Sequence, residues 1–350
     1  MSIANDFDLP CLPFSHLDNT SFNTVLYELS HGPLNYDSDR LNSLLFNPTD
    51  QTKPSNFYTS QLDPDGNFSF CSSSSNYFVE DEINAKISTE HFNPNFSVLH
   101  LNARSLIRNL DKFKFLLGRL QKPFSVIAIS ETWLSDLSAD QVNIPGYTFI
   151  SNHRATKSGG GTGLYLQDNL DYKICSDCNV SDADVIESLF VEILVPHGKN
   201  IIVGVIYRPP NHHLTDFMEK FTDILSKISR GDKCCYLTGD FNLDLLRYAD
   251  HEATQEFVDC LFSHMFVPLI NRPTRITAHS ATLIDNIFTN HFTPRFLKGI
   301  VISDISDHLP VFAYVSDDSL IHAHKRIGNR PTRNFSAANS PLSSQLDCTS

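Results

Sequence analysis

A short apolar run that ends in polar residues constrains the fold more than any other stretch. Residues 234–238, Cys-Cys-Tyr-Leu-Thr, have the composition of a buried β-strand, and Gly239 interrupts the run just before Asp240 and Asn242. A carboxylate and a carboxamide therefore emerge where a strand meets a loop, a position from which they can reach a ligand. Asp and Asn are also common in structural turns, so the meaning of this pair depends on the rest of the chain.

Charge and composition divide the chain into three regions. Residues 1–92 carry 13 acidic and 3 basic side chains, a net charge of −10, so the rest contributes only −3 of the total −13. This leader and residues 317–350 are rich in Ser, Asn and Pro, and both are predicted to be mostly disordered, with short helices at 22–29 and 77–87. One folded domain is expected at residues 93–316. The acidity of the leader leaves nucleic-acid binding by this domain open.

The cysteines form neither a disulfide pattern nor a zinc pattern. Cys175 and Cys178 are the only Cys-x-x-Cys pair, without the second pair that a zinc site needs, and adjacent Cys234 and Cys235 are predicted to be core thiols. The first twenty residues contain three Asp and no continuous apolar core, so no signal peptide is predicted. No run approaches the ~18 apolar residues of a membrane span. We therefore expect an intracellular protein of the nucleus or the cytoplasm, in a reducing compartment.

Strand and helix patterns alternate within residues 93–316. Apolar runs at 96–102 and 125–130 flank a helical pattern at 106–120, which predicts a strand–helix–strand unit with a right-handed crossover. The mixture of hairpins and crossover helices predicts an α/β protein in which two mixed β-sheets pack on each other, with helices outside. The remaining predicted elements are a hairpin at 187–195 and 200–207, helices at 217–228 and 253–264, and strands at 147–152, 164–166, 282–288, 296–302 and 311–315.

Seven polar side chains are predicted to gather at one edge of these sheets. A carboxylate at Asp285, within the apolar strand pattern 282–288, needs a partner, and His308 is the best candidate because a fixed carboxylate stabilises the charged imidazole. Oxygen ligands with one imidazole and no thiol suit Mg²⁺ or Mn²⁺ rather than zinc. The seven residues are Asn102, Glu131, Asp240, Asn242, Asp285, Asp307 and His308.

Such a site suits the hydrolysis of a phosphodiester. A metal bound by Glu131, with Asn102 and Asp307 as further candidate ligands, would offset charge at the phosphate. Asp240 would take a proton from the attacking water, and Asn242 would orient that base or donate to a phosphoryl oxygen. The imidazole of His308, oriented by Asp285, would face the non-bridging oxygens of the phosphate.

The ordered motifs resemble the endonuclease/exonuclease/phosphatase family, which includes apurinic endonucleases and deoxyribonuclease I. More narrowly, five segments resemble the endonuclease domain of non-LTR (LINE-type) retrotransposons, and the resemblance covers about residues 94–316. The motifs of the family are Asn102, Ser130-Glu131-Thr132, Tyr207, Gly239-Asp240-Phe241-Asn242, Ile284-Asp285 and Ser306-Asp307-His308. The narrower ones are residues 101–106, 130–134, 159–161, 207–210 and 306–311.

The resemblance implies a four-layer α/β sandwich and a divalent metal. By the pattern of the family, Glu131 would bind Mg²⁺, and Asp240 and Asn242 would position the nucleophile. Asp285 and His308 would form a pair of a carboxylic acid and an imidazole. Two further residues would assist at the phosphate, at the leaving group or at a second metal: Tyr207 and Asp307.

The function expected from this resemblance is a Mg²⁺-dependent DNA endonuclease that nicks one strand. DNA is the expected partner, and no organic cofactor is expected. Nothing after Val315 resembles a reverse transcriptase, which suggests a retrotransposon-derived protein without that domain. Pro210 stands where apurinic endonucleases usually carry Asn, so specificity for abasic sites is left open. The alternatives are a phosphatase or phosphodiesterase of small phosphoesters and a catalytically silent remnant that binds nucleic acid or a protein.

Overall fold

A computed structural model of the chain provides the coordinates. The structure describes residues 75–89, 92–154, 159–196, 198–210, 213–231, 233–277, 280–292 and 295–317. Three expectations lie outside the described residues: disorder of the leader before residue 75, disorder of the tail after residue 317, and the short helix at 22–29.

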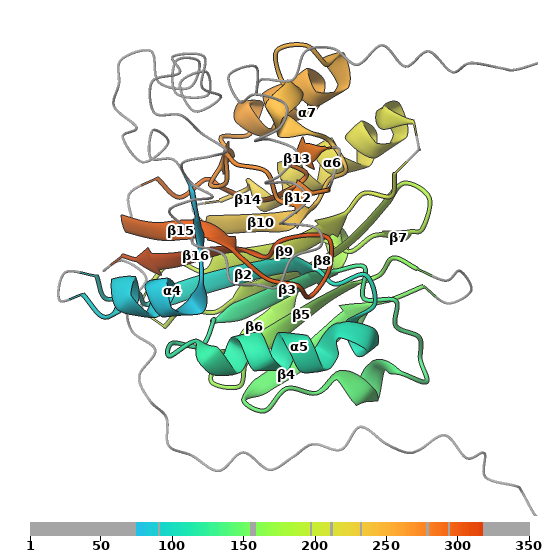
Figure 1. The fold of residues 1–350 in the computed structure, drawn as a ribbon. Coiled ribbons are helices and arrows are strands. Elements are labelled where there is room, and N and C mark those ends of the chain that lie inside the picture. The colour runs from blue at the N-terminus through green and yellow to red at the C-terminus, as the bar shows by residue number, and fades with distance from the viewer. Residues whose placement is uncertain are drawn as a thin grey trace, which may run out of the picture.

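Two large mixed β-sheets form the centre of the molecule (Figure 1). The first has the strand order β1 (Asn76–Phe78), β15 (Arg295–Val301), β16 (Val311–Ser316), β2 (Phe96–Asn102), β3 (Val126–Ser130), β5 (Thr162–Gln167) and β4 (Tyr147–Asn152). The second has the order β11 (Val267–Pro268), β14 (Asp285–Thr289), β10 (Cys234–Asp240), β9 (Ile201–Tyr207), β8 (Ile186–Ile193) and β6 (Tyr172–Ile174), with β7 (Ser181–Asp182) paired to β8. A separate pair consists of β12 (Arg275–Ile276) and β13 (Ala281–Thr282).

Helices cover the outer face of each sheet and complete four layers. Helices α4 (Glu80–Ile87) and α5 (Leu106–Arg119) share one apolar core with the first sheet, whereas α6 (Leu214–Ile228) and α7 (Glu252–Ser263) share the larger core that also fills the space between the sheets (Figure 1). The predicted four-layer α/β sandwich is confirmed. Short 3₁₀ turns occur at Ala139–Val142, Ser176–Cys178 and Leu245–Arg247. Among the described residues, no helix combines the length and the hydrophobicity that a membrane span requires.

The predicted strand–helix–strand unit is formed by β2, α5 and β3. Side chains of β2 alternate between the two cores, since Val98 faces the second sheet and Leu99 faces α5. The helix follows from apolar residues at three- and four-residue spacing, because Leu106, Leu110 and Phe113 are all buried on one side of it. The two strands pair in parallel, so their carboxyl ends meet at the same edge of the sheet.

The folded part extends further toward the N-terminus than the boundary predicted at residue 93. Strand β1 pairs in parallel with β15, and the helix predicted at 77–87 begins only at Glu80. Tyr77 is 1% exposed, and its hydroxyl donates a hydrogen bond of 2.9 Å to the backbone oxygen of Pro273. The predicted boundary at residue 93 is therefore wrong. No local sequence pattern indicates β1, because its pairing partners lie about two hundred residues further along the chain.

The strand predicted at 282–288 begins later in the structure. Thr282 pairs with Arg275 in the small two-stranded sheet, and β14 starts at Asp285. Asp285 is therefore the first residue of a strand of the second sheet and does not lie in the middle of a strand. Cys234 and Cys235, predicted as core thiols, are both buried in β10 and are free.

Gly239 in β10 pairs with Ile206 in β9 at a close approach of the two backbones. A Cβ atom at this position would lie 2.0 Å from the backbone oxygen of Ile206, which the paired strand holds in place. We expect Gly239→Ala to lower the free energy of unfolding by about 3 kcal/mol because neither strand can move away. Urea denaturation measures this change. The matched control is Gly118→Ala in α5, where no atom lies within 4 Å of the added Cβ and where Ala stabilises a helix by ~0.5–1 kcal/mol. Equal unfolding midpoints for the two variants would contradict the close approach.

Candidate active site

The first sheet contributes four of the predicted residues at one of its edges. Asn102 is the last residue of β2, and Glu131 directly follows β3, which pairs in parallel with β2. Asp307 and His308 lie in the loop before β16, which runs antiparallel to β2 and therefore starts at the same edge. The Ser306 hydroxyl fixes this loop, because it donates a hydrogen bond of 2.7 Å to the backbone oxygen of Asn102.

The second sheet contributes the other four residues. Tyr207 and Asp240 are the last residues of β9 and β10 and pair with each other in the parallel register. Asp285 opens β14 and pairs with Asp240 in the antiparallel register. Asn242 follows two residues after Asp240, with a φ of 47°, a left-handed conformation that Asn adopts more readily than most residues. The two sheets are packed so that both sets of side chains meet.

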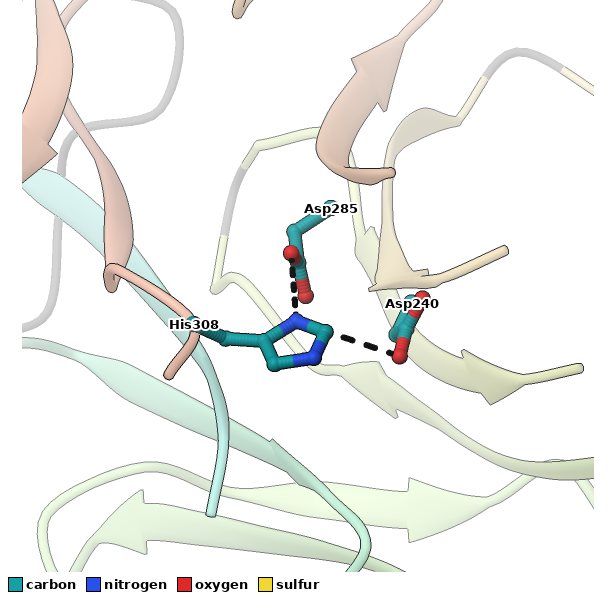
Figure 2. Close-up of side chains that lie close together, drawn as sticks. All are labelled: Asp240, Asp285 and His308. Carbon is teal, nitrogen blue, oxygen red and sulfur yellow. Dashed lines mark hydrogen bonds and ion pairs between the residues drawn. The ribbon is translucent and has the colours of Figure 1, made fainter. Parts of the chain in front are cut away.

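His308 is bound to Asp285 at the centre of the site (Figure 2). Its Nδ1 lies 2.9 Å from Oδ2 of Asp285 and 4.0 Å from Oδ2 of Asp240. All three side chains are buried. The Thr274 hydroxyl donates a further hydrogen bond of 2.8 Å to Oδ2 of Asp285 and fixes this carboxylate. Since Nδ1 is engaged, Nε2 is the ring nitrogen left to meet a substrate.

The charges of this group are strongly coupled. Burial lowers the pKa of His308, but the carboxylates of Asp285, Asp240 and Asp307 outweigh this effect and raise the pKa to about 9. Burial would raise the pKa of Asp285, but the charge and the hydrogen bond of His308 hold it below its usual value. At neutral pH the pair is therefore an imidazolium bound to a carboxylate.

Asp240 is the less acidic of the two buried carboxyl groups. Burial and then the charge of Asp285 raise its pKa to about 7, although His308 acts in the opposite direction. Its Oδ2 accepts a hydrogen bond of 2.8 Å from the amide of Asn102, and its Oδ1 accepts one of 3.0 Å from the backbone N–H of Asn242. A carboxylate with a pKa near neutrality, fixed by two donors, has the properties of a general base.

Asp240, Asp285 and His308 also offer atoms that lie within 4.8 Å of one another, close enough to surround a cation. Nδ1 of His308 and Oδ2 of Asp285 are already bound to each other at 2.9 Å, however. The geometry therefore favours an acid–imidazole pair at this point rather than a metal centre.

Asn102 and Glu131 lie at the carboxyl ends of the paired strands β2 and β3 and are bound to each other. The Asn102 Nδ2 donates hydrogen bonds of 2.9 Å to Oε1 of Glu131 and 2.8 Å to Asp240, so this amide bridges the two carboxylates. Its Oδ1 accepts a hydrogen bond of 3.1 Å from the backbone N–H of Arg104, and only this oxygen could bind a metal. Oε2 of Glu131 accepts a bond of 3.0 Å from the indole of Trp133.

Asp307 has one engaged and one unengaged oxygen. Its Oδ2 accepts hydrogen bonds of 2.9 Å from both Arg104 and Arg275. Its Oδ1 is buried without a hydrogen-bond partner among the described residues. A buried unpaired carboxylate oxygen is costly, and a bound cation would compensate it. Together with the half-buried carboxylate of Glu131, this oxygen fits the donor set of a hard divalent cation.

Tyr207 and Asn242 complete the set. Burial, followed by the negative charges of Glu131 and Asp240, raises the pKa of Tyr207 above its usual value, so the phenol stays protonated. The Asn242 Nδ2 donates a hydrogen bond of 2.8 Å to the backbone oxygen of Arg208, and the Arg208 guanidinium donates one of 3.2 Å back to the backbone oxygen of Asn242. The structure thus brings all eight predicted residues to one site.

Several residues of the site have no prediction from the sequence. His100 is fully buried, and its Nδ1 lies 3.9 Å from Oδ1 of Asp285. Burial lowers its pKa to about 4, so it is neutral. In the sequence, the only indication that His100 belongs to the site is its position two residues before Asn102, on the same face of β2. Thr274 and Arg275 lack even that signal, because they come from a segment without a strand or helix pattern.

We expect the His308 imidazole to titrate near pH 9 in the metal-free protein. The pKa is raised, so the positive charge is present below pH 9 and is lost above it. In Asp285→Asn the main attraction is removed while burial remains, so the pKa should fall by more than one unit. NMR titration of the histidine side chains measures both values, and the signal is assigned by its loss in His308→Gln. A wild-type value near 6.5 would contradict the pairing.

Comparison with known protein families assigns the sequence to one of them. The sequence model of the endonuclease/exonuclease/phosphatase family matches residues 95–308. The AP endonuclease LMAP from Leishmania major has a TM-score of 0.51 and 13% identity, with 63% of this chain and 88% of that chain covered. At such identity the likeness shows the fold alone. No curated protein matches.

Two further solved structures are similar at lower TM-scores. The endonuclease domain of TRAS1, a telomere-specific non-LTR retrotransposon, has a TM-score of 0.48 and 14% identity, covering 63% of this chain and 97% of that chain. The APE2 catalytic domain from Xenopus laevis has a TM-score of 0.49 and 17% identity, covering 63% of this chain and 91% of that chain.

The match to the family model spans more than half of the chain and contains every site residue from Asn102 to His308. Members of this family are metal-dependent phosphoester hydrolases. On this evidence the chain belongs to the endonuclease/exonuclease/phosphatase family.

Proposed function

We propose that this protein is a Mg²⁺-dependent endonuclease that nicks one strand of DNA and derives from a non-LTR retrotransposon. The observation that carries the proposal is the meeting of Asp240, Asp285 and His308, from both sheets, at one buried point. A base, a fixed carboxylate and an imidazolium at this spacing have the chemistry that phosphodiester hydrolysis needs.

Glu131 and Asp307 are the residues that would hold the cation. Glu131 presents a half-buried carboxylate at the end of β3, and Asp307 presents an oxygen without a hydrogen-bond partner in the described structure. A Mg²⁺ ion held there would offset the negative charge that builds up on the phosphate. The amide of Asn102 keeps Glu131 aligned with Asp240.

Asp240 accepts the proton of the attacking water. Its pKa of about 7 leaves it ionised above neutral pH, and the backbone N–H of Asn242 holds its second oxygen in place. As the water oxygen bonds to phosphorus, the bond between phosphorus and the leaving nucleoside oxygen breaks, and this oxygen takes up a proton from water, which leaves a nick that ends in a hydroxyl and a phosphate. Removal of the base should therefore slow the chemical step and not the binding of DNA.

His308 and Tyr207 stabilise the charge on the phosphate. The imidazolium donates through Nε2 to a non-bridging oxygen, and Asp285 fixes its orientation and its charge. The phenol of Tyr207 stays protonated and is a second donor. Fixed donors of this kind stabilise the transition state without reorganising during the reaction.

DNA is favoured over a small phosphoester by the segments at 101–106, 130–134 and 207–210, which resemble retrotransposon endonucleases. A small-molecule phosphatase of the same fold remains the competing outcome. The two are separated by the product formed, because a phosphatase releases inorganic phosphate from a small ester and leaves a plasmid intact.

A supercoiled-plasmid assay with Mg²⁺ or EDTA tests the proposal. We expect open circular product with Mg²⁺ and none with EDTA. Glu131→Gln should require at least tenfold more Mg²⁺ for half-maximal activity, whereas the control Glu256→Gln, an exposed acid on α7, should behave as wild type. Nicking that persists in EDTA, or phosphate release from a small ester without nicking, would defeat the proposal.

A further inference from the structure

A pocket of about 420 Å³ opens beside the candidate active site. Its wall includes Asp307 and Ser306, the two residues before His308, and Trp133, whose indole is bound to Glu131. The pocket is therefore continuous with the groups that would hold the metal. Its volume lies in the range that encloses one small organic ligand, such as a nucleotide.

Three cationic side chains line the pocket at four-residue intervals. Arg108 and Lys112 lie one turn apart on α5, and Arg104 lies just before the helix. Arg104 pairs with the half-buried Asp307, and Lys112 pairs with the exposed Asp304, both at 2.9 Å. The exposed pair of Lys112 is weak and can be exchanged for a phosphate. Arg108 has no ion pair within the described part of the chain, so the pocket offers an uncompensated positive charge.

Trp133, the one tryptophan of the whole sequence, lines this pocket. Trp133 is 43% exposed, although Trp is usually well buried in folded proteins. Its backbone is left-handed, with a φ of 53°, and its N–H donates a hydrogen bond of 2.9 Å to the oxygen of Gly160. The indole edge is bound to Glu131, so the ring is held in a defined orientation while part of its surface stays open. A strained backbone and an exposed, fixed aromatic ring together indicate a binding function.

We propose that this pocket is a nucleotide subsite, in which an unstacked base of the nucleic-acid strand lies on the indole of Trp133 and its phosphates contact Arg108. The inference rests on the proposed nuclease function and adds a preference to it. A base within a duplex already stacks on its neighbours, so only an unpaired or extruded base can stack on the indole. The preferred substrate therefore has an unpaired nucleotide next to the scissile phosphate.

Fluorescence of the single tryptophan reports on this pocket directly. The full chain is titrated in EDTA, where no cleavage occurs, with an oligothymidylate of about eight nucleotides. We expect saturable quenching of the indole emission, and weaker quenching by a blunt duplex of equal length at the same salt concentration. Absence of saturable quenching, or equal quenching by the duplex, would overturn the subsite.

Anisotropy of a labelled oligothymidylate tests the individual side chains. Trp133→Ala should weaken binding about tenfold, as expected for the loss of one stacked base. Arg108→Gln should lower the slope of log affinity against log salt by about 0.7, the value for one phosphate contact on a single strand. The controls are Phe115→Ala and Lys114→Gln, exposed residues of α5 outside the pocket, and neither should change the affinity. Wild-type affinity in both pocket variants would contradict the proposal.

The two proposals fail in different ways. Mg²⁺-dependent plasmid nicking without quenching of Trp133 would disprove the subsite and leave the endonuclease function intact. Quenching by the single strand without any nicking would support the subsite and disprove the nuclease. A nicking comparison completes the test, since a duplex with one unpaired nucleotide should be cleaved faster by wild type than by Arg108→Gln, and faster than the fully paired duplex.

Discussion

Asp240→Asn is expected to reduce the rate of plasmid nicking by about 10⁴-fold at saturating Mg²⁺. Asp240 is buried, its pKa is raised to about 7, and it is the carboxylate proposed to accept the proton of the attacking water. Asparagine has the same shape but cannot accept that proton at any pH. The rate constant under single-turnover conditions measures the effect on the chemical step.

The pH dependence and the stability of Asp240→Asn separate catalysis from folding. The wild-type rate should rise as the pH increases through about 7, because the base must be ionised, and this rise should be lost in the variant. Urea denaturation should show that the variant is folded. The control Asp216→Asn, at an exposed acid in the first turn of α6, should retain the wild-type rate. A variant at position 240 that nicks within tenfold of wild type would disprove the assignment of the base.

His308→Gln is expected to reduce the nicking rate by about 10³-fold. Glutamine can still donate to Asp285, so the buried carboxylate keeps a hydrogen bond, but the positive charge that faces the phosphate is lost. The affinity for DNA, measured in EDTA, should change little, because the loss falls on the transition state rather than on the bound substrate.

A double variant tests whether Asp285 acts through His308. Asp285→Asn alone should be strongly impaired, because the imidazole loses its orientation and its charge. Asp285→Asn combined with His308→Gln should be no slower than His308→Gln alone, since the second residue of a coupled pair has nothing left to act on. If the rate reduction in the double variant equals the product of the reductions in the two single variants, Asp285 contributes independently of His308.

Periodicity in the sequence was sufficient to predict the framework of the fold. The unit of β2, α5 and β3 follows from apolar runs around one amphipathic pattern, and the hairpin of β8 and β9 follows from its turn residues. The N-terminal boundary could not be predicted in this way. Strand β1 has three residues, and its place is determined by pairing with β15 far along the chain. Such pairing leaves no periodic signal in a short segment.

The site was predictable where a polar residue ends an apolar strand. Asn102, Tyr207 and Asp240 all terminate strands, so the sequence placed them at a sheet edge. Contacts made across the two sheets were not predictable. Thr274 reaches Asp285 from a short segment outside both large sheets, and no spacing rule connects the two. The depth of burial, which raises the pKa of Asp240, is likewise a property of the packed sheets and not of the local sequence.

The amide of Asn102 spans the boundary between the two sheets, because it comes from β2 and binds Asp240 at the end of β10. Hydrolysis thus depends on how one layer is seated against the other. A displacement of about 1 Å can lower the rate at a catalytic centre a hundredfold. A small shift of one sheet against the other would therefore abolish most of the activity, although the hydrogen bonds within each sheet stayed intact. In this fold the reaction rate is therefore more sensitive to the alignment of the two sheets than any spectroscopic measurement of β-strand content.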